Sequence, residues 1–302
     1  MTSNHSLHRV ISRINATYGS WNKNTSTETM RSDWDKLFAR PSIAAITEDF
    51  QFEHLACRWF SAPEITHPAI VLYIHGGGFR LGSIDSHQAL MSDIACATGC
   101  RVLGFNYRLM PDASAPAPLE DSLSLYRYLL EQGYSAQHIV VAGDSAGGGV
   151  AASLLQYIKQ QQSPALPQAA ACLLLSAWLD MTLSGDSYTS RAAQDPVHQT
   201  KMLALLAKLY AGEQANLKDP LLSALFGELS DLPPTLIQVG DCEVGLDDSV
   251  SYARQLQAAQ SSVDISVWPE MIHVFQMFAD ELPQARQAIT EMANFIHKVI
   301  QA

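Results

Sequence analysis

The stretch that most constrains the fold is residues 139–158, where a short apolar run meets a glycine-rich turn and then a helical pattern. Gly143-x-Ser145-x-Gly147 falls at the turn, which is the strand-turn-helix setting that a nucleophile elbow requires. Such a turn strains the backbone of its central residue and needs small neighbours. It would leave the Ser145 hydroxyl exposed at the carboxyl end of the strand. A serine that lies in a glycine-rich turn by chance would show the same Gly-x-Ser-x-Gly pattern, so a second motif is needed to predict a nucleophile.

The second feature is His75-Gly76-Gly77-Gly78-Phe79, directly after the apolar run 69–74. Glycines let the backbone approach a ligand closely, and acyl transfer needs hydrogen-bond donors waiting for the developing oxyanion. We therefore predict an oxyanion hole made by the amides of Gly76, Gly77 and Ala146, the last being the residue after the nucleophile. A phosphate-binding loop is the alternative, but it needs Gly-Lys-Ser/Thr or a Gly-x-Gly-x-x-Gly that opens a helix, and neither spacing is present.

With these motifs the chain resembles the hormone-sensitive-lipase-like carboxylesterases of the α/β-hydrolase superfamily. The resemblance begins near residue 45 and is carried, in the family's order, by residues 75–79, 107–109, 143–148, 178–180 and 271–273. It implies an α/β-hydrolase fold, a mostly parallel central sheet flanked by helices, with a helical cap. It also implies a supporting role around the oxyanion loop for His75, Gly78, Tyr107 and Arg108. Met110 and Asp112 depart from the alanine and glutamate that relatives usually have there.

The rest of the chain fits this architecture, because buried strand patterns alternate with helical ones. Two apolar stripes at helical spacing precede the first strand, so residues 1–44 are expected to form helices that the resemblance assigns to a cap. Residues 183–212 break the alternation and resemble a second part of that cap. The core would then comprise residues 45–182 and 213–302. An N-terminal arm for a partner protein or a membrane surface is the alternative for the first helices.

Composition narrows the possible partners. The chain has 302 residues, of which 47% are hydrophobic, so it can bury a sizeable core, and its formal net charge is −11. That charge disfavours nucleic acid and anionic membrane surfaces, which attract clustered basic residues. We expect no signal peptide, because residues 1–6 have no basic cluster followed by an apolar core. We also expect no membrane span, because no apolar run approaches the roughly 20 residues that a spanning helix needs.

The chain has five cysteines and no Cys-x-x-Cys pair, which favours reduced thiols and a cytoplasmic location. Cys96 and Cys100 are one helical turn apart, a spacing that also suits a metal or redox pair. Neither a metal nor an organic cofactor is expected.

A serine hydroxyl needs an imidazole as base, and the imidazole needs a carboxylate to fix its tautomer. In this fold the order along the chain is serine, acid, histidine. Only His273 and His297 come late enough. His297 falls inside the predicted last helix, whereas His273 follows the strand 263–268 in a short loop. We therefore expect His273 to be the base.

Four carboxylates compete for the role of the acid after the strand 235–239: Asp241, Glu243, Asp247 and Asp248. The family usually has Asp-Pro-Leu-x-Asp here, and aligning the following helix places Glu243 at the catalytic position. Asp241 is the runner-up. Asp247 and Asp248 are expected to cap the next helix and complement its dipole.

These residues predict a serine carboxylesterase that hydrolyses short- to medium-chain acyl esters, the substrate range that the resemblance implies. A deacetylase, amide hydrolase or lactone hydrolase using the same triad remains open. So does regulation of a partner protein through the cap helices. Plant gibberellin receptors resemble this family but lack the catalytic histidine, so the presence of His273 argues against a purely ligand-binding receptor. The oligomeric state cannot be read from the sequence.

Overall fold

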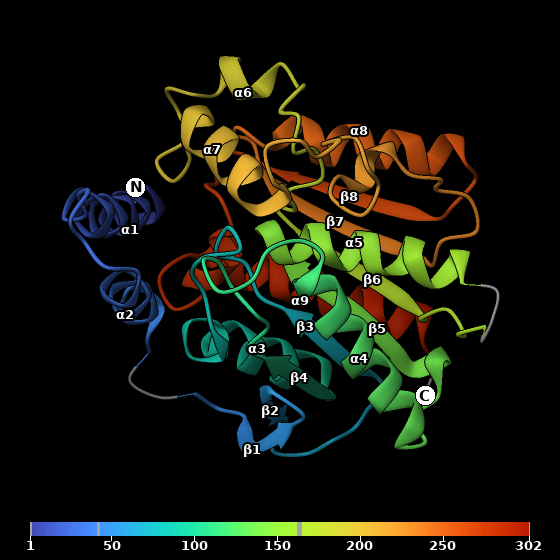
Figure 1. The fold of residues 1–302 in the computed structure, drawn as a ribbon. Coiled ribbons are helices and arrows are strands. Elements are labelled where there is room, and N and C mark those ends of the chain that lie inside the picture. Colours follow the sequence, from blue (N-terminus) through green and yellow to red (C-terminus); the bar gives the residue numbers. More distant parts are fainter. Residues whose placement is uncertain (1, 41–42, 162–164, 302) are drawn as a thin grey trace.

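The protein is described by a computed structural model that covers residues 2–40, 43–161 and 165–301. Its centre is one eight-stranded sheet with the order β1-β2-β4-β3-β5-β6-β7-β8 (Figure 1). β4, β3, β5, β6, β7 and β8 pair in parallel, and β1 and β2 add an antiparallel edge. The predicted α/β-hydrolase fold with a mostly parallel sheet is therefore confirmed. The strands are β1 Ile46–Phe52, β2 Leu55–Ser61, β3 Ile70–Ile74, β4 Arg101–Phe105, β5 Ile139–Asp144, β6 Ala171–Leu175, β7 Thr235–Gly240 and β8 Val263–Trp268.

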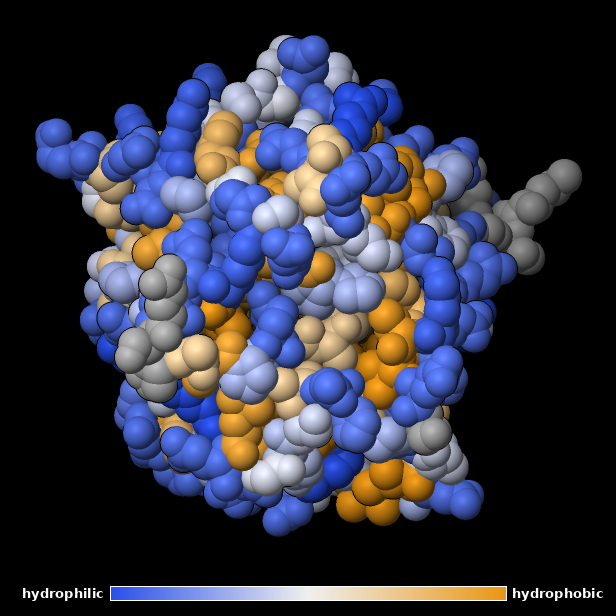
Figure 2. Space-filling view, turned by 90° about the vertical axis from the view of Figure 1, so that its right-hand side faces the viewer, coloured by the Kyte–Doolittle hydropathy of each residue, from blue (hydrophilic) through white to orange (hydrophobic). Residues whose placement is uncertain are grey.

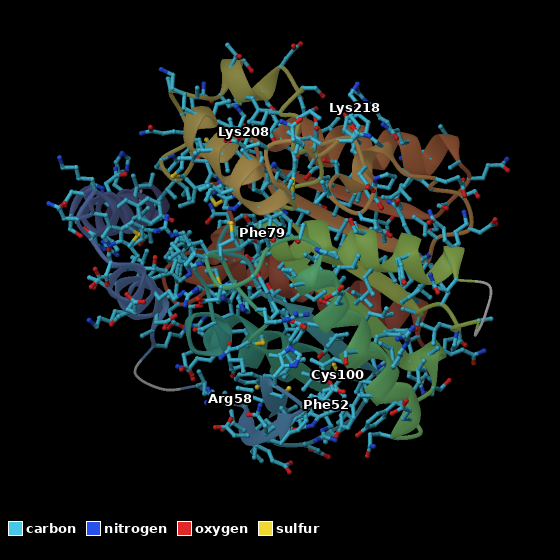
Figure 3. The ribbon with its side chains drawn as sticks, in the orientation of Figure 1. Phe52, Arg58, Phe79, Cys100, Lys208 and Lys218 are labelled. Atoms are coloured by element: carbon cyan, nitrogen blue, oxygen red, sulfur yellow. The ribbon has the colours of Figure 1, made fainter. Side chains whose placement is uncertain are left out.

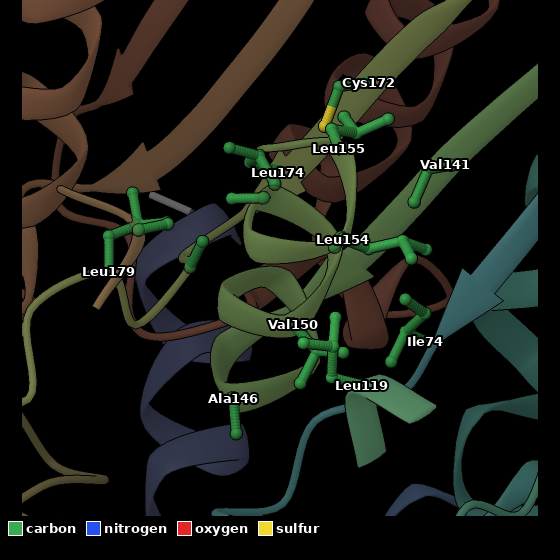
Figure 4. Close-up of a cluster of buried hydrophobic side chains, with 14 of the residues drawn as sticks. Ile74, Leu119, Val141, Ala146, Val150, Leu154, Leu155, Cys172, Leu174 and Leu179 are labelled. Carbon is green, nitrogen blue, oxygen red and sulfur yellow. The ribbon is translucent and has the colours of Figure 1, made fainter. Parts of the chain in front are cut away.

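Helices cover both faces of the sheet because its central strands are apolar on both sides. In β5, Val141 faces one core while Val140 and Ala142 face the other. The first core includes α4 (Ala117–Glu131), α5 (Ser145–Gln160) and α8 (Leu246–Ala258), and the second includes α3 (Ile84–Thr98) and α9 (Pro283–Val299). Figure 4 shows Val141 beside Leu154 and Ile74 in the first core, with Ala146 at the start of α5.

Two elements differ from the sequence patterns. The strand-like segment 45–60 is a hairpin, β1 and β2, because the chain turns at Glu53 with a positive φ of 51°. No sequence pattern predicted α3. In that helix the polar side chains of Ser86, His87 and Ser92 are buried along with the apolar ones, so the helical stripe is blurred.

Four helices lie outside the sheet and its two covering layers (Figure 1): α1 (Thr2–Gly19), α2 (Thr27–Phe38), α6 (Ser187–Ser190) and α7 (Thr200–Ala211). α7 is joined to the core by Tyr210, whose ring stacks on Phe79 with centroids 3.6 Å apart. Phe79 lies near the middle of the molecule, below the α7 residue Lys208 in the view of Figure 3. Short 3-10 helices occur at Ala136–His138 (η1), Ala224–Phe226 (η2) and Phe275–Phe278 (η3).

The surface is largely hydrophilic where Figure 2 shows it, on the face at the right of Figure 1, and apolar patches lie between the polar side chains. Exposed large apolar side chains are found on α7, at Met202, Leu205 and Leu209. These three side chains also border the cavity that contains Ser145.

Candidate active site

Ser145 occupies the sharp turn between β5 and α5, with a φ of 51°. Its glycine neighbours are required by close packing. A Cβ on Gly147 would lie 2.1 Å from the carbonyl oxygen of Ile74, and one on Gly143 would lie 2.5 Å from the carbonyl oxygen of Gly147. The strained turn is held by the Trp178 amide, which donates a 2.8 Å hydrogen bond to the Ser145 carbonyl. This is the geometry that the sequence predicted for a nucleophile elbow.

His273 follows β8 and its Nδ1 lies 2.8 Å from Oε2 of Glu243, in the loop after β7. The Glu243 carboxylate is buried, and its other oxygen accepts hydrogen bonds from the Ser176 hydroxyl at 2.7 Å and the Gly240 amide at 2.5 Å. Since a carboxylate can only accept, the proton on Nδ1 belongs to His273, and Nε2 is left free to take a proton.

Asp241, the other candidate acid, points to a different neighbour. Its Oδ1 accepts the backbone amide of Glu270 at 2.7 Å, and no hydrogen bond to His273 is found among the described residues. Asp247 and Asp248 do not cap α8 through their side chains. Asp248 instead accepts the amides of Leu179 and Asp180, and Asp247 accepts the amide of Ser187. Their hydrogen bonds hold the loop after β6, which is a role the sequence analysis did not assign.

The surroundings of His273 favour its protonated form. Burial alone would lower the pKa of the imidazole, but the hydrogen bond and the charge of Glu243 outweigh burial, and Asp195 and Asp144 add to them. The net effect raises the pKa of His273 above its ordinary value. The carboxylate that fixes the tautomer of His273 thus also stabilises its protonated form.

Ser145 and His273 both line one cavity of about 610 Å³. Its floor is formed by the ends of the strands, and its walls come from the helices outside the sheet. One wall is aromatic, because Tyr18 stacks on both Trp21 and Trp34, and Trp34 contacts Phe38. The opposite wall is aliphatic and is formed by α7 through Met202, Leu203, Leu205, Leu206 and Leu209.

One predicted oxyanion donor needs correction. The Gly76 amide donates a 3.0 Å hydrogen bond to Asp144, so it is already occupied and is not presented to the cavity. Gly77 and Gly78 line the cavity and have φ angles of 114° and 62°. Ala146 lies in the first turn of α5, where backbone amides have no acceptor within the helix. We therefore propose the amides of Gly77, Gly78 and Ala146 as the donors of the oxyanion hole.

The residues predicted to support the oxyanion loop differ in what they contact. The Tyr107 hydroxyl donates a 2.8 Å hydrogen bond to the His75 carbonyl, and the His75 ring stacks on Tyr107 at 4.3 Å. Arg108 instead binds the Asp121 carboxylate, at the start of α4. No sequence pattern pointed to Arg31 in α2, whose guanidinium donates to the carbonyls of Arg80 and Met110 and so ties α2 to the loop.

Comparison with known proteins identifies the fold and the class of enzyme. Residues 71–277 match the family model described as the alpha/beta hydrolase fold. An acetyl-hydrolase of Streptomyces hygroscopicus is 38% identical over 244 residues, which is 80% of this chain and 80% of that protein. An esterase of Acinetobacter venetianus is 35% identical over 226 residues, covering 75% and 74% of the two chains. The crystal structure of an esterase from the bacterial hormone-sensitive lipase family superposes with a TM-score of 0.93 at 36% identity, covering 99% of this chain and 100% of that one.

The chain is an esterase of the hormone-sensitive lipase family. The predicted family is confirmed, and so is the class of enzyme, a carboxylic ester hydrolase.

A buried carboxylate beneath the oxyanion loop of this esterase escaped the sequence analysis. Asp144 accepts the Tyr73 hydroxyl at 2.9 Å as well as the Gly76 amide, and His87 Nε2 lies 3.3 Å away. Burial alone would raise the pKa of Asp144, but the charge of His87 and the hydrogen bonds from His87 and Tyr73 lower it. The acidic residue beside the nucleophile was the available signal, since a charge is rarely buried without partners.

No group of three or more histidine, cysteine, aspartate or glutamate side chains is arranged to hold a metal ion in the described part of the esterase. The five cysteines are free thiols. No helix among the described residues is long and apolar enough to cross a bilayer.

Proposed function

We propose that this esterase hydrolyses short- to medium-chain acyl esters through the triad of Ser145, His273 and Glu243. The observation that carries the proposal is the buried Glu243 carboxylate, which is hydrogen-bonded to Nδ1 of an imidazole on the same cavity as the strained Ser145. The acetyl-hydrolase among the relatives supports a small acyl group. The substrate is a small-molecule ester, and no cofactor is required.

The chemistry follows from the roles that these groups can fill. Ser145 Oγ attacks the ester carbonyl carbon while Nε2 of His273 takes the hydroxyl proton. Glu243 keeps Nδ1 protonated and stabilises the imidazolium. The negative charge on the carbonyl oxygen is bound by backbone amides of the oxyanion hole, a contribution typically worth about 3–4 kcal/mol for one donor. His273 then protonates the leaving alcohol, and water repeats the sequence to release the acid.

The cavity sets the size of the acyl group. Its volume of about 610 Å³ lies inside the range of roughly 300–1,000 Å³ that is usual for small-molecule sites. Its walls are apolar, so each methylene of an acyl chain that enters the cavity gains about 0.8 kcal/mol at most. We therefore propose that residues 1–44 and 183–212 form a cap that selects the acyl chain, since the aromatic and aliphatic walls come from these segments.

The test is a series of p-nitrophenyl esters from acetate to dodecanoate, with the wild-type protein and Ser145→Ala. We expect kcat/KM to rise by up to about fourfold per methylene until the chain fills the cavity, and then to fall. Ser145→Ala should lose turnover of every ester. Substantial hydrolysis by that variant would refute the assignment of the nucleophile, and a maximum at dodecanoate would refute the substrate range.

A further inference from the structure

A second histidine contacts the base of the proposed triad. The His198 ring lies against the His273 ring with centroids 4.1 Å apart and planes at 68°, an edge-to-face contact. His198 comes from the segment between α6 and α7, some 75 residues before His273 in the chain, and it lines the same cavity. The triad uses neither of its ring nitrogens, so its position beside His273 calls for another explanation.

Asp195 fixes the position of His198. Its Oδ1 accepts the backbone amides of Val197 at 2.8 Å and His198 at 2.9 Å, which closes the turn that presents the ring. Its Oδ2 accepts the amide of Val244 at 2.9 Å. Val244 is the residue directly after Glu243, so a single carboxylate ties the turn carrying His198 to the loop carrying the triad acid.

A second tether strengthens this connection. The Ser187 hydroxyl donates to the Val244 carbonyl at 2.6 Å, and the Ser187 amide donates to Asp247 at 2.9 Å. Val244 is therefore held through both its amide and its carbonyl by the segment 187–198. Because both hydrogen bonds to Val244 are buried, the segment and the acid loop should move as one unit.

The charges around the two rings are consistent with a packing role. Burial and the neighbouring His273 lower the pKa of His198 well below its ordinary value, which favours the neutral ring. The acidic groups that act on His273 are Glu243, Asp195 and Asp144, and no positive charge faces it from His198. A neutral ring can fill the space beside the imidazole without opposing the imidazolium that forms during turnover.

We propose that His198, held in place by Asp195, is a positioning residue that packs against the His273 imidazole and keeps it in the orientation that the triad needs. The inference rests on the proposed function, because it assigns His198 a role through His273. It also makes the turn 195–198 part of the catalytic apparatus as well as a wall of the cavity.

The first test compares His198→Ala, His198→Phe and the matched control Gln194→Ala. Gln194 lies in the same segment, is exposed and bonds only to Arg191 among the described residues. His198→Ala should lower kcat about tenfold, since small errors in orientation are costly in catalysis, while KM for p-nitrophenyl acetate changes less than about twofold. His198→Phe restores a flat ring and should recover most of kcat. Gln194→Ala should match the wild type.

A second measurement does not depend on activity. The pKa of His273 is followed by NMR of the imidazole Cε1–H, assigned with His273→Gln. His198→Ala admits water beside the ring, which favours the charged form, so the pKa should rise. Asp195→Asn removes a nearby negative charge, so the pKa should fall. The pH at which activity is lost on the acid side should rise in His198→Ala and fall in Asp195→Asn. Thermal unfolding checks that each variant is folded.

The proposal is overturned if His198→Ala matches Gln194→Ala in kcat and in the pKa of His273. It is also overturned if His198→Phe is as impaired as His198→Ala, because the ring nitrogens and not the packing would then matter. A failure of the proposed function is recognised separately, by Ser145→Ala retaining turnover. The NMR titration repeated on the Ser145→Ala protein still decides whether His198 and Asp195 act on His273.

Discussion

Replacing Glu243 by glutamine is the most direct test of the proposed triad, because the structure predicts how the new side chain would be oriented. One oxygen of Glu243 accepts from the Ser176 hydroxyl and the Gly240 amide, and the other accepts from His273 Nδ1. A glutamine has only one acceptor oxygen. The Ser176 hydroxyl and the Gly240 amide both donate on one side, so the glutamine oxygen must face them and its NH₂ group must face His273.

That orientation forces the wrong tautomer on the base. Facing an N–H donor, Nδ1 of His273 must become the acceptor, and its proton moves to Nε2. A protonated Nε2 cannot take the proton from Ser145. The corresponding change of aspartate to asparagine in a serine-protease triad lowers kcat by about 10⁴. We expect a fall of roughly 10³–10⁴ in kcat, or about 4–5.5 kcal/mol at 1.36 kcal/mol per tenfold, with KM little changed.

The pH dependence of activity is an independent test of the role of Glu243. Glu243 raises the pKa of His273, and the neutral imidazole is the active form, so wild-type activity is lost as the pH falls through this raised pKa. In Glu243→Gln that contribution is absent. The residual activity should therefore survive to lower pH than in the wild type, measured as the acid limb of kcat/KM for p-nitrophenyl butyrate.

Asp241→Asn is the matched control, since Asp241 lies two residues away and bonds to the Glu270 amide. It should cost no more than about fivefold in kcat, because the asparagine oxygen can still accept the Glu270 amide and only the charge assistance to that hydrogen bond is lost. If Glu243→Gln kept activity within tenfold of wild type, or if the two variants lost the same amount, the assignment of Glu243 as the acid would be wrong.

Three further predictions concern the loop and the cap. Trp34→Ala removes the middle of the aromatic wall, so the preferred p-nitrophenyl ester, the one with the highest kcat/KM, should have an acyl chain at least two carbons longer than in the wild type. An unchanged preference would mean that the acyl chain does not bind against this wall. Arg31→Ala breaks the bonds to the Arg80 and Met110 carbonyls and should lower kcat more than it raises KM, as measured by steady-state kinetics on the acetate ester. Burial is the main cause that lowers the pKa of His75 to about 3. Between pH 6.5 and 3 the unfolded chain therefore binds a proton at His75 that the folded protein does not bind. The free energy of unfolding should then fall by about 1.4 kcal/mol for each pH unit from pH 6.5 toward 3. His75→Asn should lessen that slope in urea unfolding, and equal slopes would count against a buried neutral His75.

Local signals were enough to predict much of this molecule. The strand, turn and helix around Ser145 are adjacent in the chain, so their pattern predicts the elbow directly. His273 and Glu243 each follow a strand of the same sheet, and parallel strands bring their carboxyl ends to one edge. The loop after β7 offered two acidic residues two positions apart, and only the fold shows that Glu243 turns toward His273 while Asp241 turns toward Glu270.

The contacts that sequence reasoning missed all join distant segments. The Gly76 amide bonds to Asp144 across 68 positions of the chain, and no pattern in the glycine run reveals which of its amides is already occupied. Arg31 reaches 79 positions to the Met110 carbonyl. His198 and Asp195 fall in a segment that the sequence marked only as an interruption of the strand and helix alternation. Periodicity reports which face of an element is buried, but it carries no information on which side chain crosses to another segment.

Part of the backbone strain in the scaffold lies beside the proposed triad. Ser145, Ser176 and Val274 are three non-glycine residues with φ near 50°, and each borders the triad. Such conformations cost on the order of 1–3 kcal/mol each and persist only where surrounding bonds enforce them. Here Ser176 supplies that enforcement, because its hydroxyl donates to Glu243 and accepts from the Val274 amide at 3.1 Å, beside His273. One small side chain thus connects the acid to the backbone of the base, so the strain and the triad geometry should be gained or lost together.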